Sequence, residues 1–254
     1  MSIFAADALK GKTFLVTGAS SGLGKATAIM IAECGGQVLA SGRNESRLTA
    51  CIEAMKGTNH IALTFDLSNA DEVADWVKSI AKKYGALSGI FHSAGLGLVL
   101  PARMIKQSHL ESLLQSSLFA AFGIARAASS KGIITDGGSI VFMSSVIGSR
   151  GQLGMTAYSA VKSGIDGMVR SLACELAPRK IRANSILAGA VETEMIAEWR
   201  AISDKAAVAE LEGRHLLGFG NPEDVANTVL FLLSDASQWI TGTNLVIDGG
   251  YMVR

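Results

Sequence analysis

The sequence predicts an α/β fold: a doubly wound parallel sheet of about seven strands with helices on both faces. Short apolar runs alternate with longer stretches of helical periodicity, which is typical of parallel strands joined by crossover helices. The apolar runs are continuous rather than alternating, as strands covered on both faces require. The chain has 254 residues, of which 49% are apolar. That is enough for one large core, so we expect a single domain over residues 1–254.

The expected strands are short apolar runs that recur along the whole chain. They cover Thr13–Thr17, Val38–Ala40, His60–Thr64, Ile90–His92, Ser139–Met143, Ile181–Leu187 and Asn244–Ile247. No linker rich in proline or serine and no internal repeat separates them, which favours one continuous sheet.

Helical patterns fill the intervals between these runs. They cover Lys25–Glu33, Ser46–Met55, Asp71–Lys83, roughly Gln107–Ser130, Ala157–Ala177 and Pro222–Ser234. Gly35 and Gly36 end the first pattern, and Pro222 stands near the start of the last, where proline is favoured.

The stretch 192–220 interrupts this rhythm. It contains two short helical patterns, Glu194–Trp199 and Ala206–Leu211, and it follows an expected strand. In an α/β fold an insertion after the carboxyl end of a strand lies over the ligand crevice. We therefore expect 192–220 to form a lid over a substrate.

Charge and hydropathy exclude several classes of function. Lysine and arginine total 23 against 22 aspartates and glutamates, a net charge of +1. This balance gives no basic surface for nucleic acid and no polybasic patch for an anionic membrane. The chain has no apolar run of about 18 residues and no signal peptide at its start. We expect a soluble, cytoplasmic protein.

The three cysteines are Cys34, Cys51 and Cys174. Their odd number and wide spacing predict a reducing compartment without a disulfide framework. We expect each to be a small buried side chain rather than a metal ligand, and we expect no metal site.

A glycine-rich turn joins the first expected strand to the helix that follows. It consists of Gly18, Ala19, Ser20, Ser21, Gly22, Leu23 and Gly24. Glycines at such a turn let a dinucleotide diphosphate approach the backbone N–H groups at a helix N-terminus. The spacing Gly-x3-Gly-x-Gly differs from the commonest dinucleotide fingerprint, and the alternative is an ordinary tight turn.

Two residues after the next strands are candidates for the adenosine end of a dinucleotide. Arg43 follows the second strand, where no acid is present to bind a free ribose 2′-hydroxyl. Its guanidinium suits a 2′-phosphate, which favours NADP(H) over NAD(H); the alternative is a solvated surface arginine. Asp66 follows the third strand and can accept a hydrogen bond from an adenine amino group or cap the next helix.

Tyr158 and Lys162 are four residues apart at the front of an expected helix, so they share one face. A nearby ammonium stabilises phenolate and lowers the pKa of a tyrosine, which suits it to proton transfer with an alcohol or ketone. Ser145 follows an expected strand, 13 residues before Tyr158. A serine at a strand's carboxyl end can donate a hydrogen bond to a substrate carbonyl.

Taken together, the glycine turn, Ser145 and the Tyr158–Lys162 pair make the sequence resemble the classical short-chain dehydrogenases/reductases over nearly its whole length. It is most similar to members that reduce 3-oxoacyl-[acyl-carrier-protein]. The resemblance implies a Rossmann fold and a catalytic Ser145, Tyr158 and Lys162. It further implies cofactor contacts from Gly18, Ser20, Ser21, Gly22, Leu23, Gly24, Arg43, Asp66, Leu67, Ala94, Gly95, Tyr158, Lys162, Gly189, Val191 and Thr193.

The sequence departs from the family's pattern at three places. Ser117 stands where relatives carry an asparagine that holds a proton-relaying water, so Ser117 is a fourth catalytic candidate. Ser93 replaces the asparagine before Ala94 and follows His92, which we expect to be a core histidine. Ala188 replaces a proline, a change expected to loosen the loop beside the nicotinamide.

We therefore expect an NADP(H)-dependent oxidoreductase that interconverts a ketone and a secondary alcohol, including a 3-oxoacyl thioester on a carrier. The resemblance implies a homotetramer or homodimer built from the helices of 107–130 and 157–177 and the last strand. Two alternatives stay open: a cofactor-binding regulatory protein with a degenerate site, and a sugar-nucleotide epimerase or dehydratase.

Overall fold

The computed structural model describes residues 4–254. Its centre is a sheet of seven parallel strands in the order β3-β2-β1-β4-β5-β6-β7. The strands are β1 (Thr13–Thr17), β2 (Gln37–Gly42), β3 (Ile61–Thr64), β4 (Leu87–His92), β5 (Ile134–Ser145), β6 (Arg182–Ala188) and β7 (Asn244–Ile247). This is the doubly wound Rossmann arrangement that the sequence predicts.

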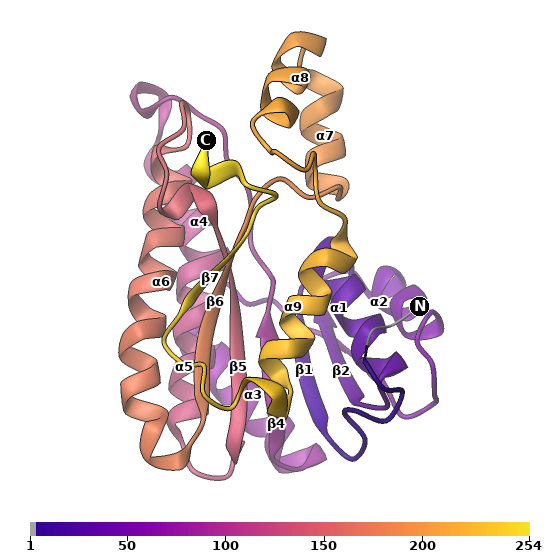
Figure 1. The fold of residues 1–254 in the computed structure, drawn as a ribbon. Helices are drawn as coiled ribbons and strands as arrows, with labels where there is room; N and C mark the ends of the chain where they lie inside the picture. The colour runs from indigo at the N-terminus through magenta and orange to yellow at the C-terminus, as the bar shows by residue number, and fades with distance from the viewer. Residues whose placement is uncertain (1–3) are drawn as a thin grey trace.

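Helices cover both faces of the sheet (Figure 1). One face carries α1 (Gly22–Glu33), α2 (Glu45–Glu53) and α9 (Pro222–Leu233); the other carries α3 (Ala70–Tyr84), α5 (Ala120–Ser129) and α6 (Thr156–Leu176). Each interface is a separate apolar layer of buried strand and helix side chains. Because both faces are covered, the strands are continuous apolar runs.

Two further helices rise beyond the carboxyl edge of the sheet, where Figure 1 draws them in orange. They are α7 (Glu194–Ile202) and α8 (Lys205–Gly213), and they follow β6. We call residues 192–215 the α7–α8 segment. Its position is the one expected for an insertion over the ligand crevice.

Several element boundaries differ from the prediction. Helix α1 begins at Gly22 rather than Lys25, because the glycine turn itself forms the first helical residues. Strand β5 begins at Ile134 rather than Ser139, with an irregularity in its pairing to β4. The expected long helix over 107–130 is confirmed, but with a π-helical turn at Leu114–Phe119 between α4 (Gln107–Leu113) and α5.

Cys34 and Cys51 are buried, as expected, but Cys174 is exposed. That expectation was wrong for Cys174. It lies on α6 near Ala173 and Leu176, which are buried, but its own side chain is on the exposed side of the helix. Within residues 4–254 no helix is long and apolar enough to cross a membrane. The same residues contain no cluster of side chains that could hold a metal ion.

Candidate active site

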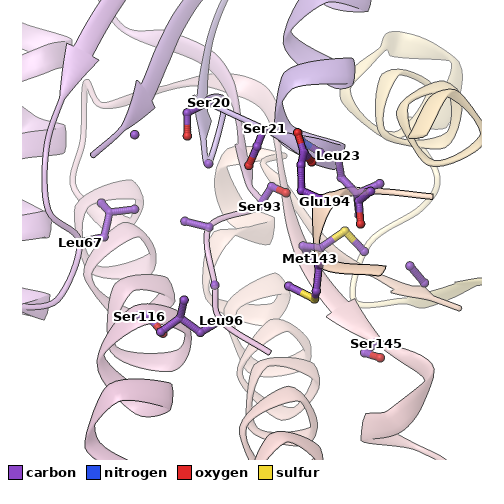
Figure 2. A pocket seen from close by; sticks show the side chains of 18 of the residues that line it. Ser20, Ser21, Leu23, Leu67, Ser93, Leu96, Ser116, Met143, Ser145 and Glu194 are labelled. Atoms are coloured by element: carbon purple, nitrogen blue, oxygen red, sulfur yellow. The ribbon is translucent and has the colours of Figure 1, made fainter. Parts of the chain in front are cut away.

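A cleft of about 610 Å³ lies at the carboxyl ends of the central strands. Strands β1 and β4 are neighbours there. The sheet continues through β2 and β3 beyond β1, and through β5, β6 and β7 beyond β4, so the strand order reverses between β1 and β4. Ligands of open α/β sheets bind at such a switch point. Figure 2 shows side chains from the glycine turn, β5 and α7 around this cleft.

The cleft brings together every predicted site residue except Gly24 and Ser117. Its lining includes Gly18, Ser20, Ser21, Gly22, Leu23, Arg43, Asp66, Leu67, Ala94, Gly95, Ser145, Tyr158, Lys162, Gly189, Val191 and Thr193. These residues come from segments spread over most of the chain, and they meet because the ends of parallel strands share one edge.

The glycine turn is packed directly against the segment after β4. At Gly18, where φ is +70°, an added Cβ would lie 2.8 Å from the Ala94 nitrogen. At Gly24 it would lie 2.3 Å from the Gly18 carbonyl oxygen. Gly24 therefore lies behind the cleft, where the absence of a side chain lets the helix pack against the Gly18 carbonyl. Gly18 and Gly22 instead line the cleft, where the absence of side chains leaves the backbone of the turn accessible.

The N-terminus of α1 already holds an anionic oxygen. The Gly22 N–H donates to the Glu194 carboxylate over 3.1 Å, and the Ser21 side chain makes no capping hydrogen bond. Figure 2 shows the Glu194 side chain beside Ser21 and Leu23. A helix N-terminus that accepts a carboxylate has the chemistry to accept a phosphate, so these residues fit a dinucleotide diphosphate.

Arg43 and Asp66 lie in the part of the cleft reached from β2 and β3. Asp66 accepts a hydrogen bond from the Ser68 N–H over 3.0 Å. The cap of α3 is instead Asn69, whose side chain accepts from the N–H groups of Asp71 and Glu72. The capping alternative for Asp66 is therefore wrong, and Asp66 is part of the cleft lining.

Ser145, Tyr158 and Lys162 meet where β5 ends beside the start of α6. The Lys162 ammonium donates to the Met143 carbonyl over 2.9 Å and lies 5.6 Å from the centre of the Tyr158 ring. The Ser145 hydroxyl accepts from the Ile147 N–H over 3.2 Å, and its interaction with Tyr158 acts to lower the Tyr158 pKa. The expected serine, phenol and ammonium therefore share one wall of the cleft.

Burial controls the acidity of this group. It raises the pKa of Tyr158 to about 12, against the opposing hydrogen bond with Ser145. Burial also lowers the pKa of Lys162 to about 8, although the Asp166 carboxylate acts to raise it. The predicted lowering of the Tyr158 pKa was wrong for this state, because desolvation of the phenolate raises that pKa. Tyr158 is therefore a neutral phenol at pH 7 and suited to donate a proton.

Ser117 lies in the π-helical turn, fully buried, and outside the cleft lining. An added Cβ at Gly95 would lie 2.9 Å from the Ser117 Oγ and 3.7 Å from the Lys162 Nζ, so these groups are close neighbours. The Ser117 Oγ has no hydrogen-bond partner among residues 4–254. Its role in a proton relay stays a prediction.

His92 is a core histidine, as expected. It is buried, bonded to the Thr17 hydroxyl over 2.8 Å, and its other nitrogen contacts the Ser117 carbonyl at 3.4 Å. Burial, then the Lys162 charge, lowers its pKa to about 4.

The sequence reasoning missed several lining residues. They include Leu96, Ser112, Gln115, Ser116, Met143 and Glu194. Ser112, Gln115 and Ser116 have helical spacing and could have been found as a polar stripe. Glu194 gave no such signal, because its partner Gly22 is 172 residues away.

A dinucleotide-sized cleft at a Rossmann switch point, with a serine, tyrosine and lysine on one wall, defines an oxidoreductase-like site. The comparisons with known proteins agree. Residues 18–252 match the family model described as Enoyl-(Acyl carrier protein) reductase. The chain belongs to the short-chain dehydrogenases/reductases and is similar to the 3-oxoacyl-[acyl-carrier-protein] reductases among them.

Individual relatives cover almost the whole chain. A 3-oxoacyl-[acyl-carrier-protein] reductase of Thermotoga maritima is 33% identical over 247 residues, 96% of this chain and 99% of the relative. Carbonyl reductase family member 4 of Danio rerio is 34% identical over 237 residues, 93% of this chain and 96% of the relative. A solved short-chain dehydrogenase/reductase from Mycobacterium ulcerans has a TM-score of 0.88 at 30% identity, and the match covers 97% of this chain and 91% of that one.

Proposed function

We propose that this protein transfers hydride between NADP(H) and a ketone or secondary alcohol, with 3-oxoacyl thioesters as the substrate class. The single observation that carries the proposal is the meeting of Ser145, Tyr158 and Lys162 in the cleft whose other end is the glycine turn. The relatives named as carbonyl and 3-oxoacyl reductases support the substrate class.

Each of the three side chains has a distinct task in ketone reduction. A bound nicotinamide supplies the hydride that the carbonyl carbon receives. Tyr158 donates its phenolic proton to the carbonyl oxygen, so the C=O becomes CH–OH. Ser145 donates a hydrogen bond to the same oxygen as negative charge develops on it. The Lys162 ammonium stabilises the phenolate that Tyr158 leaves behind, until solvent returns a proton.

The choice of NADP(H) over NAD(H) rests on Arg43. It is exposed in the cleft lining directly after β2, and its side chain makes no ion pair among the described residues. An uncompensated guanidinium is suited to a 2′-phosphate, which it can bind through two hydrogen bonds. The wild-type protein should use NADPH at least tenfold better than NADH, measured as kcat/KM for each.

The test of the proposal is NADPH oxidation with a 3-oxoacyl thioester, followed at 340 nm. We expect Tyr158→Phe to lower turnover at least a thousandfold and to leave NADPH binding within about threefold of wild type. Tyr84→Phe, at the end of α3 and outside the cleft, is the matched control and should keep full turnover. Wild-type turnover in Tyr158→Phe would overturn the mechanism, and tight NADPH binding without turnover on any ketone would favour a regulatory protein.

Two exposed aromatic rings near the start of α5 support an assembly of identical chains. Phe119, at the end of the π-helical turn, and Phe122, in α5, are 42% and 49% exposed. Such large apolar side chains are typical of a surface that another chain covers. Light scattering should give the mass of a dimer or tetramer, and a monomer would contradict this part of the proposal.

A further inference from the structure

His215 lies just after α8, at the base of the α7–α8 segment, and is 4% exposed. Its Nε2 is 3.0 Å from the Ala190 nitrogen, and its Nδ1 is 2.9 Å from the Leu211 carbonyl oxygen. A backbone N–H can only donate, so Nε2 is the acceptor. Nδ1 then carries the proton and donates to Leu211. The imidazole is neutral, and both of its nitrogens are bonded.

Ala190, whose N–H donates to His215, belongs to a wall of the cleft. Gly189, Ala190 and Val191 follow β6 and line the cleft together with Ser145 and Tyr158. Backbone groups hold two other groups of this wall: the Gly189 N–H donates to the Ile247 carbonyl, and the Ala190 carbonyl accepts from the Gly220 N–H. The Ala190 N–H is bound by a side chain instead.

The wall sits directly on the imidazole. An added Cβ at Gly189 would lie 2.9 Å from the His215 Nε2. Gly189 is one residue beyond Ala188, which pairs with Ser145 across β5 and β6. A displacement of this wall would therefore move backbone atoms that lie beside Ser145.

Aromatic contacts fix the plane of the imidazole ring. The Tyr251 ring lies 4.7 Å from it at 32°, and the Phe219 ring lies edge-on at 5.5 Å. Tyr251 is itself held by Arg150, which stacks over its ring and donates to its carbonyl. The acceptor nitrogen is thus aimed at Ala190 by packing from the C-terminal residues and from the loop before α9.

We propose that His215 is a positioning residue: it couples the α7–α8 segment to the Gly189–Val191 wall, and so sets the affinity for the nicotinamide end of the cofactor. This inference rests on the proposed function for the identity of the cofactor. It does not depend on the substrate.

The test compares His215→Leu with His215→Gln. Leucine fills the space but leaves the Ala190 N–H without an acceptor, whereas glutamine offers an oxygen acceptor on a side chain of similar reach. We expect His215→Leu to weaken NADPH binding about tenfold, measured by cofactor fluorescence. His215→Gln should restore it to within about threefold of wild type.

A second histidine supplies a matched control. His60 is 8% exposed and also accepts a hydrogen bond from a backbone N–H, that of Val38, over 3.1 Å. Val38 is near the start of β2, at the end of the sheet opposite the cleft. His60→Leu should lower the melting temperature as much as His215→Leu does, without changing NADPH affinity.

Hydrogen exchange of the cofactor-free protein gives a readout independent of binding and turnover. The backbone of residues 188–192 should exchange faster in His215→Leu than in wild type or in His215→Gln. Unchanged exchange and unchanged NADPH affinity in His215→Leu would overturn the inference, as would equal losses in the leucine and glutamine variants. If the wild-type protein fails to bind NADPH, the proposed function is overturned instead. The exchange measurement would still test whether His215 holds the backbone of the Gly189–Val191 wall.

Discussion

Glu194 competes with the cofactor for the N-terminus of α1, so removing its charge should tighten cofactor binding. Its carboxylate accepts a hydrogen bond from the Gly22 N–H over 3.1 Å, at the turn that fits a diphosphate. Binding of a diphosphate there displaces the carboxylate from the helix N-terminus. The two anionic groups then remain neighbours in the cleft, and they repel each other.

The magnitude follows from these two effects. An anion at an exposed helix N-terminus is stabilised by about 0.3–1 kcal/mol, which is lost on displacement. Two unit charges about 4 Å apart in water repel by about 1 kcal/mol. The two effects sum to about 1.3–2 kcal/mol; because about 1.4 kcal/mol corresponds to a tenfold change in affinity, Glu194→Gln should bind NADPH roughly 10- to 30-fold more tightly. The gain should shrink in 0.5 M salt, because salt screens exposed charges.

The assay is NADPH titration by fluorescence at two salt concentrations, with Glu198→Gln as the control. Glu198 lies one helical turn further along α7 and has no ion pair or hydrogen bond to α1. Its variant removes the same charge and should change affinity less than twofold. Equal or weaker binding by Glu194→Gln would refute the reasoning, and an equal gain in both variants would show a general charge effect.

Three further predictions concern the groups behind the cleft. Gly24→Ala should bind NADPH at least tenfold more weakly, because its Cβ would lie 2.3 Å from the Gly18 carbonyl oxygen. Gly167→Ala is the control and should bind normally, because its Cβ would contact only the end of the flexible Arg170 side chain. Burial lowers the pKa of His92 from 6.5 to about 4, so its neutral form stabilises the fold above pH 6.5 and this contribution is lost as the pH falls through 4. Between pH 7 and pH 4 the free energy of unfolding should thus fall by about 3 kcal/mol more in wild type than in His92→Asn, as measured by urea denaturation. Equal falls in the two proteins would contradict the effect of burial on the His92 pKa. Ser117→Ala should raise the melting temperature, because the Oγ has no hydrogen-bond partner within residues 4–254, and a lower melting temperature would show that the hydroxyl is bonded.

Features that are local in the sequence were predicted well. Strands β1 and β7 have the predicted bounds, and the spacing of Tyr158 and Lys162 placed both on one helix face. Parallel-sheet geometry then brought Ser145 to the same edge. These predictions succeed because they depend on the periodicity of neighbouring residues and on one general rule about strand ends.

Features that depend on burial or on distant segments were not predicted. Sequence spacing indicated that Lys162 lowers the pKa of Tyr158, but only the folded structure reveals that burial raises it. The π-helical turn that contains Ser117 is likewise invisible in a pattern read as one long helix. Spacing reports which groups can meet, and it does not report how much water remains around them.

The two unpredicted contacts of the α7–α8 segment act on different segments that line the same cleft. Glu194, at the start of α7, binds the glycine turn and must release it when a diphosphate arrives. His215, after α8, binds the Gly189–Val191 wall and can keep its hydrogen bonds throughout. If both inferences hold, the segment does not open as a rigid body: its first turn moves while its base stays packed on Tyr251. The variants of these two residues should then have opposite effects on cofactor affinity, which no uniform loosening of a lid would produce.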